Sequence, residues 1–158
     1  MAQPSRNSAP VLYRVMNSST LLDGKVQIQS LPVIQGTPPA DSPRLKRLFL
    51  PQGELAQFYS GEQGIRYIAF AELRPDCVRG NHYHNVKEEF VYLLSGESLL
   101  VVDDIECKTR ASTTLKAGDL VFIRTRIAHA FRPVCAGQAI EFSSAAFNAA
   151  DVHRFPLI

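Results

Sequence analysis

The amino-acid sequence predicts an all-β protein, in which a sandwich or barrel of short antiparallel strands follows an extended N-terminal arm. Beyond residue 45, short apolar runs recur about every eight to twelve residues, and Gly, Pro, Asp or Ser separates them. No stretch keeps a helical apolar period over three turns, so neither a helical bundle nor an alternation of strands and helices is predicted. Regular short strands with turn signals are typical of sandwiches and barrels.

The first 45 residues differ in composition from the rest. They hold six of the ten prolines, with Ser, Gln and Asn between them. Two strand-like pieces occur there, Val26–Ile28 and Leu31–Ile34. Because proline is tolerated at sheet edges and not in central strands, we expect residues 1–45 to form an irregular arm with edge strands. Residues 46–158 are expected to form one barrel domain.

The predicted strands of that domain are its apolar runs: Arg47–Leu50, Leu55–Tyr59, Ile65–Leu73, Phe90–Leu94, Ser98–Val102, Leu120–Ile123 and Ala139–Ser144. The predicted breaks include Ser95-Gly96 and Ala136-Gly137. Since Phe90–Leu94 is apolar on both faces, we expect it to pack against a second sheet or a second subunit, which favours a homodimer.

Composition excludes several classes of protein. The net charge of 158 residues is only +2, and no block of Lys and Arg occurs, so neither nucleic acid nor a membrane is an expected partner. No apolar stretch is long enough to span a bilayer, and the N-terminus lacks the apolar core of a signal peptide. The three cysteines, Cys77, Cys107 and Cys135, form no Cys-x-x-Cys motif. We therefore expect reduced, mostly buried thiols in a cytoplasmic protein.

The stretch from Gly80 to Gly96 carries the chemistry. His82 and His84 are two residues apart in a β-prone run, so both imidazoles point to the same face of a strand. Glu89 begins the next apolar run, and His129 lies in a later segment. Three imidazoles and one carboxylate are suitable ligands for a divalent transition metal. We expect one such ion, with Zn as the first choice and Fe, Mn or Ni as the others.

This stretch resembles the first conserved motif of the cupins. The spacing from His82 through Glu89 to Gly96 matches that motif, and Gly118 and His129 keep part of the second. Arg124, Arg126 and Pro133 stand where the second motif has proline, glycine and asparagine. The resemblance covers about residues 64–146. It implies a double-stranded β-helix, or jelly roll, with a metal or substrate site inside the barrel.

The segment Arg79 to His84 looks like the Arg-Gly-x-His-x-His signature of cupins in sugar-nucleotide and capsular polysaccharide biosynthesis. Nucleotide-sugar 3,4-ketoisomerases share it without a metal and usually carry Gln at the position of Glu89, so Glu89 favours a metal-binding member. The resemblance implies an epimerase or isomerase that removes and returns a proton next to a carbonyl. His82 or His84 would be metal ligand or base.

Other residues are candidates for holding the substrate. Arg79 is suited to bind a phosphate or carboxylate through two hydrogen bonds. Arg124 and Arg126 could bind a diphosphate beside His129. Tyr92 is a further candidate for the substrate site. The expected ligand is of the carbohydrate type. Two alternatives stay open on the sequence, which are an Fe(II)-dependent dioxygenase and a non-catalytic module that binds or senses a small molecule.

Overall fold

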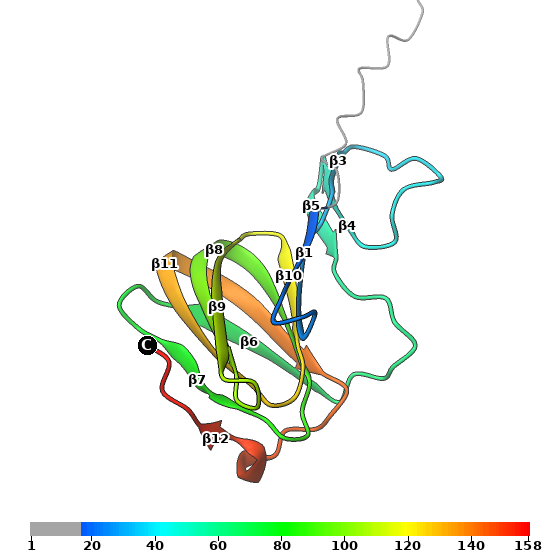
Figure 1. The fold of residues 1–158 in the computed structure, drawn as a ribbon. Coiled ribbons are helices and arrows are strands. Elements are labelled where there is room, and N and C mark those ends of the chain that lie inside the picture. Colours follow the sequence, from blue (N-terminus) through cyan, green and yellow to red (C-terminus); the bar gives the residue numbers. More distant parts are fainter. Residues whose placement is uncertain (1–16) are drawn as a thin grey trace, which may run out of the picture.

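The computed structural model describes residues 17–158, and these form almost entirely β-structure (Figure 1). The strands are β1 (Asn17–Leu21), β2 (Val26–Ser30), β3 (Val33–Gln35), β4 (Lys46–Leu50), β5 (Gly53–Gln57), β6 (Tyr67–Leu73), β7 (Arg79–Tyr83), β8 (Glu89–Asp104), β9 (Thr109–Lys116), β10 (Asp119–Ile123), β11 (Ile127–Ser143) and β12 (His153–Arg154). A short 3-10 helix, η1 (Ala149–Asp151), precedes β12. The all-β prediction is confirmed.

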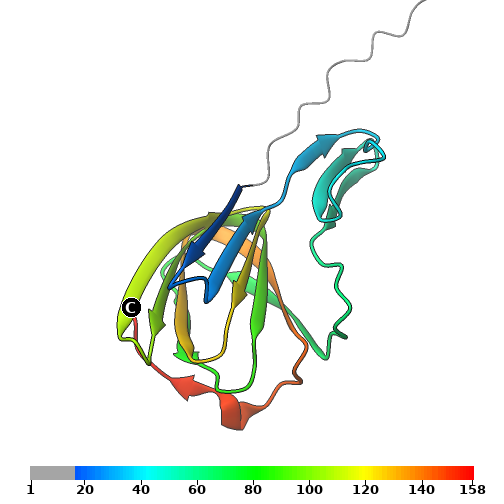
Figure 2. The ribbon, with the colours of Figure 1, turned by 45° about the vertical axis from the view of Figure 1, so that its right-hand side comes forward.

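Within residues 17–158, nine strands form one sheet in the order β1-β2-β10-β8-β11-β7-β12, with β6 added to β11 and β9 added to β8. This sheet curves around a common interior (Figure 2). Strands β3, β4 and β5 form a small second sheet beside it. Within residues 17–158, no helix has the length and apolarity needed to cross a membrane.

The two long strands β8 and β11 divide the apolar residues between two faces. Inside the barrel the core contains Val26, Ile28, Ala71, Leu73, Val91, Leu93, Leu100, Val102, Leu115, Val121, Ile123, Ile127, Phe131 and Ala139. On the outer face, Tyr92 and Phe142 pack with Phe58 and Tyr59, which belong to the segment that follows β5. The sequence predicted that both faces of Phe90–Leu94 are buried. Part of the outer face is indeed covered, by residues of the same chain.

Two predicted breaks turn out to lie inside long strands. Ser95-Gly96 falls within β8 and Ala136-Gly137 within β11, where the pairing register of the two strands shifts. A Cβ atom on Gly137 would lie 2.3 Å from the carbonyl oxygen of Ser95. The glycines thus let the two backbones approach closely where the strands bend, and they do not end the strands.

The boundary expected at residue 46 does not separate the sheets. Residues Val26–Ser30 pair with β10 in the main sheet, and β3 pairs in parallel with β4 across that boundary. The expectation for residues 1–16 of the arm lies outside the described residues.

The cysteines also differ from expectation. All three are free but exposed, because they lie in turns or at a bulge and not on inward-facing strand positions.

Candidate functional site

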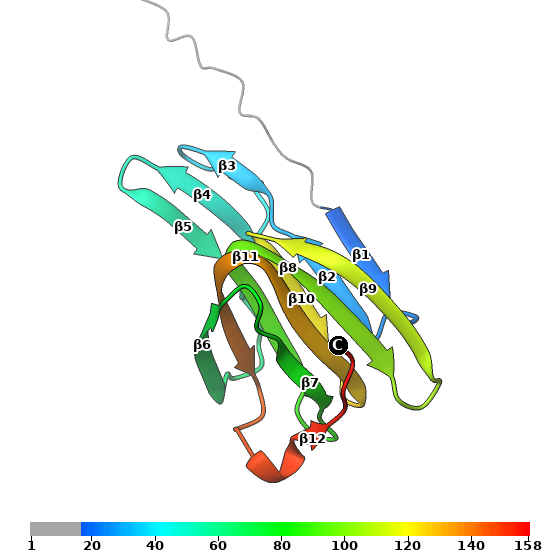
Figure 3. The ribbon, with the colours of Figure 1, turned by 90° about the vertical axis from the view of Figure 1, so that its left-hand side faces the viewer.

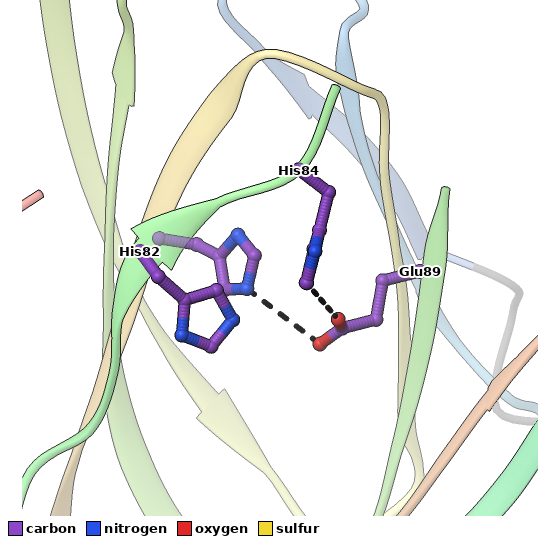
Figure 4. Close-up of side chains that lie close together, drawn as sticks. His82, His84 and Glu89 are labelled. Carbon is purple, nitrogen blue, oxygen red and sulfur yellow. Dashed lines mark ion pairs between the residues drawn. The ribbon is translucent and has the colours of Figure 1, made fainter. Parts of the chain in front are cut away.

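Four side chains named from the sequence lie together inside the barrel: His82, His84, Glu89 and His129. One ligand atom from each lies within 4.8 Å of the other three. Three of the side chains are almost fully buried, and His82 is half-buried. Figure 4 shows the ring of His82 on β7, the ring of His84 directly after β7 and the carboxylate of Glu89 on β8 pointing toward one another. We call these four residues the His–Glu cluster.

A backbone irregularity in β7 directs the first histidine. Gly80 and Asn81 have φ of 92° and 57°, in the left-handed region that favours glycine and tolerates asparagine. A Cβ atom on Gly80 would lie 2.5 Å from the carbonyl oxygen of His129. The register between β7 and β11 shifts next to His129, directly after it pairs with His82. The bulge therefore brings two imidazoles from different strands side by side, with ring centres 4.7 Å apart.

Backbone carbonyls fix the orientation of two rings. Nδ1 of His84 lies 2.7 Å from the carbonyl oxygen of Asp151, and Nδ1 of His129 lies 3.0 Å from that of Ile127. A carbonyl only accepts, so each Nδ1 donates its proton and each neutral ring presents the lone pair of Nε2 to the cluster. These two Nε2 atoms lie 3.4 Å and 3.6 Å from the oxygens of Glu89.

The electrostatics keep Glu89 ionised and two of the histidines neutral. Burial alone would raise the pKa of Glu89, but His129, His84 and Lys87 together outweigh burial and hold this pKa below its usual range. Burial lowers the pKa of His129, and burial with the neighbouring His129 lowers that of His82 to about 4. For His84, burial is outweighed by Glu89 and the Asp151 carbonyl, so its pKa is raised.

This arrangement fits a divalent cation. Within residues 17–158, the buried Nε2 atoms of His84 and His129 have no hydrogen-bond partner. Both face the carboxylate of Glu89, so a neutral ring would place a lone pair against a negative oxygen. A cation among these atoms would satisfy all of them, and imidazole and carboxylate are suitable donors for Zn, Fe, Mn or Ni. His84 and His129 already have the outer carbonyl contact that commonly orients metal-binding histidines.

A buried ion pair adjoins the cluster. The ammonium of Lys87, which is 5% exposed, donates to Oε2 of Glu89 at 3.1 Å and to Oε1 of Glu141. It also lies 4.5 Å from the ring centre of Tyr67. Burial and the charge of Glu89 raise the pKa of Glu141. Lys87 therefore holds the two carboxylates together.

A cavity of about 70 Å³ opens beside the cluster. Its polar lining is Arg79, His82, Glu89, His129 and Glu141, and its apolar lining is Ala71, Leu73, Val91, Leu93, Leu115, Phe131 and Ala139. A shallower depression of about 530 Å³ shares Arg79 and Gly80 with it. The enclosed cavity has room for a group of a few atoms, and a larger ligand would extend past Arg79.

Glu141 was not identified from the sequence, although a signal was present. It is the one charged residue in the apolar stretch from Ala139 to Phe142, and strand alternation places it on the inward face with Ala139. Lys87 and Asp151 gave no comparable signal, because both lie outside the predicted strands. Their roles depend on tertiary contacts.

Three predicted substrate residues do not line the cavity. Tyr92 alternates with Val91 and Leu93, so it faces the outer core, where its ring stacks on Phe58 with centres 4.4 Å apart. The exposed side chain of Arg126 pairs with Glu106 at 2.8 Å. Arg124 is exposed as well, because the chain leaves the strand after β10. The left-handed backbone of Arg126, with φ of 63°, ends the strand alternation that was to place both arginines beside His129. Of the predicted arginines, Arg79 lines the cavity.

Comparison with protein families matches residues 69–140 to the cupin domain. A search of curated proteins found no significant match. Among solved structures, the dTDP-6-deoxy-D-glucose-3,5-epimerase RmlC of Legionella pneumophila Philadelphia 1 is 14% identical, with a TM-score of 0.66 over 87% of this chain and 76% of that one. A 3,4-ketoisomerase of Helicobacter canadensis is 19% identical, with a TM-score of 0.62 over 70% and 86% of the two chains. The 4-keto-6-deoxy sugar epimerase NovW of Streptomyces spheroides is 15% identical, with a TM-score of 0.69 over 94% and 77%.

At these identities the solved structures show a shared fold. Together with the family match, they confirm the resemblance to the cupins and the jelly-roll barrel that it implied.

Proposed function

We propose that this protein, whose residues 69–140 match the cupin domain, is an isomerase or epimerase of sugar nucleotides that binds a divalent metal. The observation that carries the proposal is the His–Glu cluster, whose open side faces a cavity with Arg79 at its edge. The solved structures of similar fold include sugar-nucleotide epimerases and ketoisomerases, which supports this class of substrate. Fold alone does not determine chemistry, so the residues of the site must carry the mechanism.

The proposed reaction transfers a proton at a carbon next to a carbonyl. A divalent metal in the cluster would polarise that carbonyl and acidify the adjacent C–H bond. His84, Glu89 and His129 are the deeply buried donors that would hold the ion. His82 lines the cavity and is neutral at pH 7, since its pKa is lowered to about 4. It is therefore able to accept the proton and to return it to the substrate, with no net gain or loss of atoms.

His82 has two candidate roles, as fourth metal ligand and as base, and one variant separates them. If His82→Gln keeps the metal but loses proton exchange, His82 is the base. If the same variant loses the metal, His82 is a ligand. Glu141 also lines the cavity, and it would hold the proton when His82 is bound to metal.

The anionic part of the substrate would lie outside the enclosed cavity. Since that cavity measures about 70 Å³, it accepts the reacting end of a sugar and not a whole nucleotide sugar. The guanidinium of Arg79 lies where the cavity meets the shallower depression. It is positioned to bind a phosphate bidentately while the reacting carbon is near His82.

Solvent deuterium exchange tests the reaction. The purified protein, loaded with Zn²⁺ or Mn²⁺, is incubated in D₂O with a panel of 4-keto sugar nucleotides, and mass spectrometry follows deuterium uptake. We expect uptake at carbon next to the carbonyl. It should fall at least tenfold in Arg79→Met, mainly through KM, and stay unchanged in Arg132→Met, an exposed position on β11 outside the cavity lining. No uptake from any panel member would contradict the proposal.

A second candidate is an Fe(II)-dependent dioxygenase acting on a small molecule. The apolar lining of the cavity favours it, because Leu73, Leu115 and Phe131 offer no partner for the hydroxyl groups of a sugar. Histidine and carboxylate donors also suit Fe(II). Oxygen consumption in the Fe(II)-loaded protein, with no deuterium uptake from sugar nucleotides, would select this function over the isomerase.

We also propose that the protein is a cytoplasmic homodimer. Ile68 and Phe70 on β6 are 67% and 59% exposed, and they extend the outer apolar face next to Ile140 and Phe142 of β11. A second copy of the chain on this face would remove both side chains from water. The reducing cytoplasm would keep the three exposed thiols in the free state.

A further inference from the structure

The C-terminal segment, residues 148–158, lies along the strand that carries His82. On one side, β7 pairs with β11 at three positions, and the register shifts between them. On its other side, β12 pairs with it, placing His153 opposite Tyr83 and Arg154 opposite His82 (Figure 3). The C-terminal segment thus supports β7 on the side opposite β11, where the pairing with β11 is short and irregular.

Asp151 joins the start of this segment to His84. Its backbone carbonyl accepts from Nδ1 of His84 at 2.7 Å. Its carboxylate, on a residue 7% exposed, accepts from three successive backbone N–H groups, those of Asn85, Val86 and Lys87, at 2.8 to 3.2 Å. One side chain therefore satisfies the turn that leads from His84 to Glu89, and the same residue orients the His84 ring.

Asn81 joins the end of the segment to β7. Its side-chain oxygen accepts from the N–H of Leu157 at 2.8 Å, and its side-chain amide donates to the carbonyl of Ile158 at 2.9 Å. Its own carbonyl accepts from the N–H of Phe155 at 2.8 Å. Between the two attachments, the ring of His153 stacks on that of Tyr83 with centres 5.0 Å apart.

We propose that Asp151 and Asn81 are positioning residues, through which the C-terminal segment fixes the geometry of the His–Glu cluster. The inference rests on the proposed metal site. Asp151 holds the His84 ring in the tautomer that presents Nε2, and both residues hold the irregular strand that carries His82. If the attachments are removed, the barrel should keep its interior core, because that core contains no residue of the C-terminal segment, whose Leu157 and Phe155 belong to a separate cluster. The cluster should lose its fixed geometry.

The test compares full-length variants: Asp151→Ala, Asp151→Asn, Asn81→Ala, and Arg154→Ala as the control. Arg154 lies in the same segment with an exposed side chain. Zn²⁺ affinity is measured by competition with a chromophoric chelator, and the absorption spectrum of the Co²⁺-loaded protein reports ligand geometry. Melting curves establish that each variant is folded.

We expect Asp151→Ala to bind Zn²⁺ about 10- to 100-fold more weakly than the wild type, with an altered Co²⁺ spectrum. Asn81→Ala should show a smaller loss, and Arg154→Ala none. Asp151→Asn keeps one acceptor oxygen and should recover part of the affinity. If Asp151→Ala does not fold, Asp151→Asn and Asn81→Ala provide the comparison.

Two outcomes separate this inference from the proposed function. If the wild type binds metal and the folded Asp151 and Asn81 variants match it in affinity and spectrum, the positioning role is wrong and the metal site stands. If the wild type binds no metal, the proposed metal site is wrong. Ring-nitrogen NMR of the metal-free protein then tests whether Asp151 still positions the His84 ring. Asp151→Ala keeps the backbone carbonyl that contacts His84 but loses the carboxylate that holds this carbonyl in place against the turn. The inference then requires the proton on Nδ1 of His84 in the wild type and a mixture of tautomers in Asp151→Ala; identical spectra would overturn it.

Discussion

The Nε2 atom of His84 lies 3.4 Å from Oε2 of Glu89, and both side chains are buried. Nδ1 of the same ring already binds a backbone carbonyl, so the lone pair of a neutral ring faces a negative oxygen. The contact is favourable only when positive charge, from a proton or a metal ion, lies between the two atoms. His129 repeats the relationship with the other oxygen of Glu89 at 3.6 Å.

The metal-free protein should lose stability in acid, in part through His82. The unfolded histidine titrates near 6.5 and the folded one at about 4. Between these values the unfolded chain binds a proton that the folded chain does not, so this contribution is complete above pH 6.5 and is lost as the pH falls toward 4. A shift of this size corresponds to at most about 3 kcal/mol. His84 acts in the opposite direction, because its raised pKa favours the folded state at low pH.

Urea unfolding at pH 7 and pH 5, with EDTA present, checks this contribution. We expect His82→Gln to lose less stability between the two values than the wild type, whereas His153→Gln, outside the cluster, should follow the wild type. An equal loss in His82→Gln and the wild type would be inconsistent with a lowered pKa at His82.

Replacing Lys87 by Met should destabilise the fold. The buried ammonium lies between Glu89 and Glu141, and its removal leaves two carboxylates without their common partner. Breaking a buried pair in this way costs about 3–5 kcal/mol. Denaturant unfolding measures the loss, and the double variant Lys87→Met/Glu141→Leu should recover part of it. A single variant as stable as the exposed control Lys108→Met would contradict the role given to Lys87.

Replacing Gly137 by Ala should also destabilise the fold, because the new Cβ would lie 2.3 Å from the carbonyl oxygen of Ser95. Forcing an extra methyl group into a packed position costs about 1–3 kcal/mol. Gly64 is the matched control, since a Cβ there has open space and its φ is not positive. The thermal midpoint should fall for Gly137→Ala and change little for Gly64→Ala, and equal midpoints would count against a close approach of β8 and β11.

The proposed dimer should dissociate when the outer face of β6 carries a charge. Phe70→Glu places a carboxylate on the exposed apolar face, where a partner would have to bury it. Light scattering at micromolar concentration should report a dimer for the wild type and a monomer for this variant. Val134→Glu changes an exposed apolar residue on β11 and should remain dimeric. A monomeric wild type would remove the proposal.

The sequence was sufficient for the barrel and for the His–Glu cluster, because both follow from strand alternation and the spacing of a motif. His82 and His84 share a face for that reason, and Glu89 begins the next strand in phase with Val91 and Leu93. The same alternation excludes Tyr92 from the cavity, since it is on the opposite face of β8.

The remaining features depend on contacts between distant segments. No local pattern indicates that the carboxylate of Asp151 accepts hydrogen bonds from the turn after His84. Nor does one indicate that the ammonium of Lys87 donates to both Glu89 and Glu141. Arg126 could not be placed either, because its left-handed backbone follows from the tight connection between β10 and β11. Ser95-Gly96 and Ala136-Gly137 look like turns in the sequence, but they lie where the register of the paired strands β8 and β11 shifts, and only the contact between the two backbones shows this.

Metal titration of the purified, EDTA-stripped protein tests the central claim most directly. Isothermal calorimetry with Zn²⁺, Mn²⁺ and Fe²⁺ should show about one ion per chain for at least one metal. Binding should be lost in His84→Ala, which removes a buried ligand, and kept in His153→Ala, which removes a histidine outside the cluster. A wild-type protein that binds none of these ions at micromolar concentration, or a His84→Ala variant that binds as the wild type does, would contradict the assignment of these four residues as a metal site.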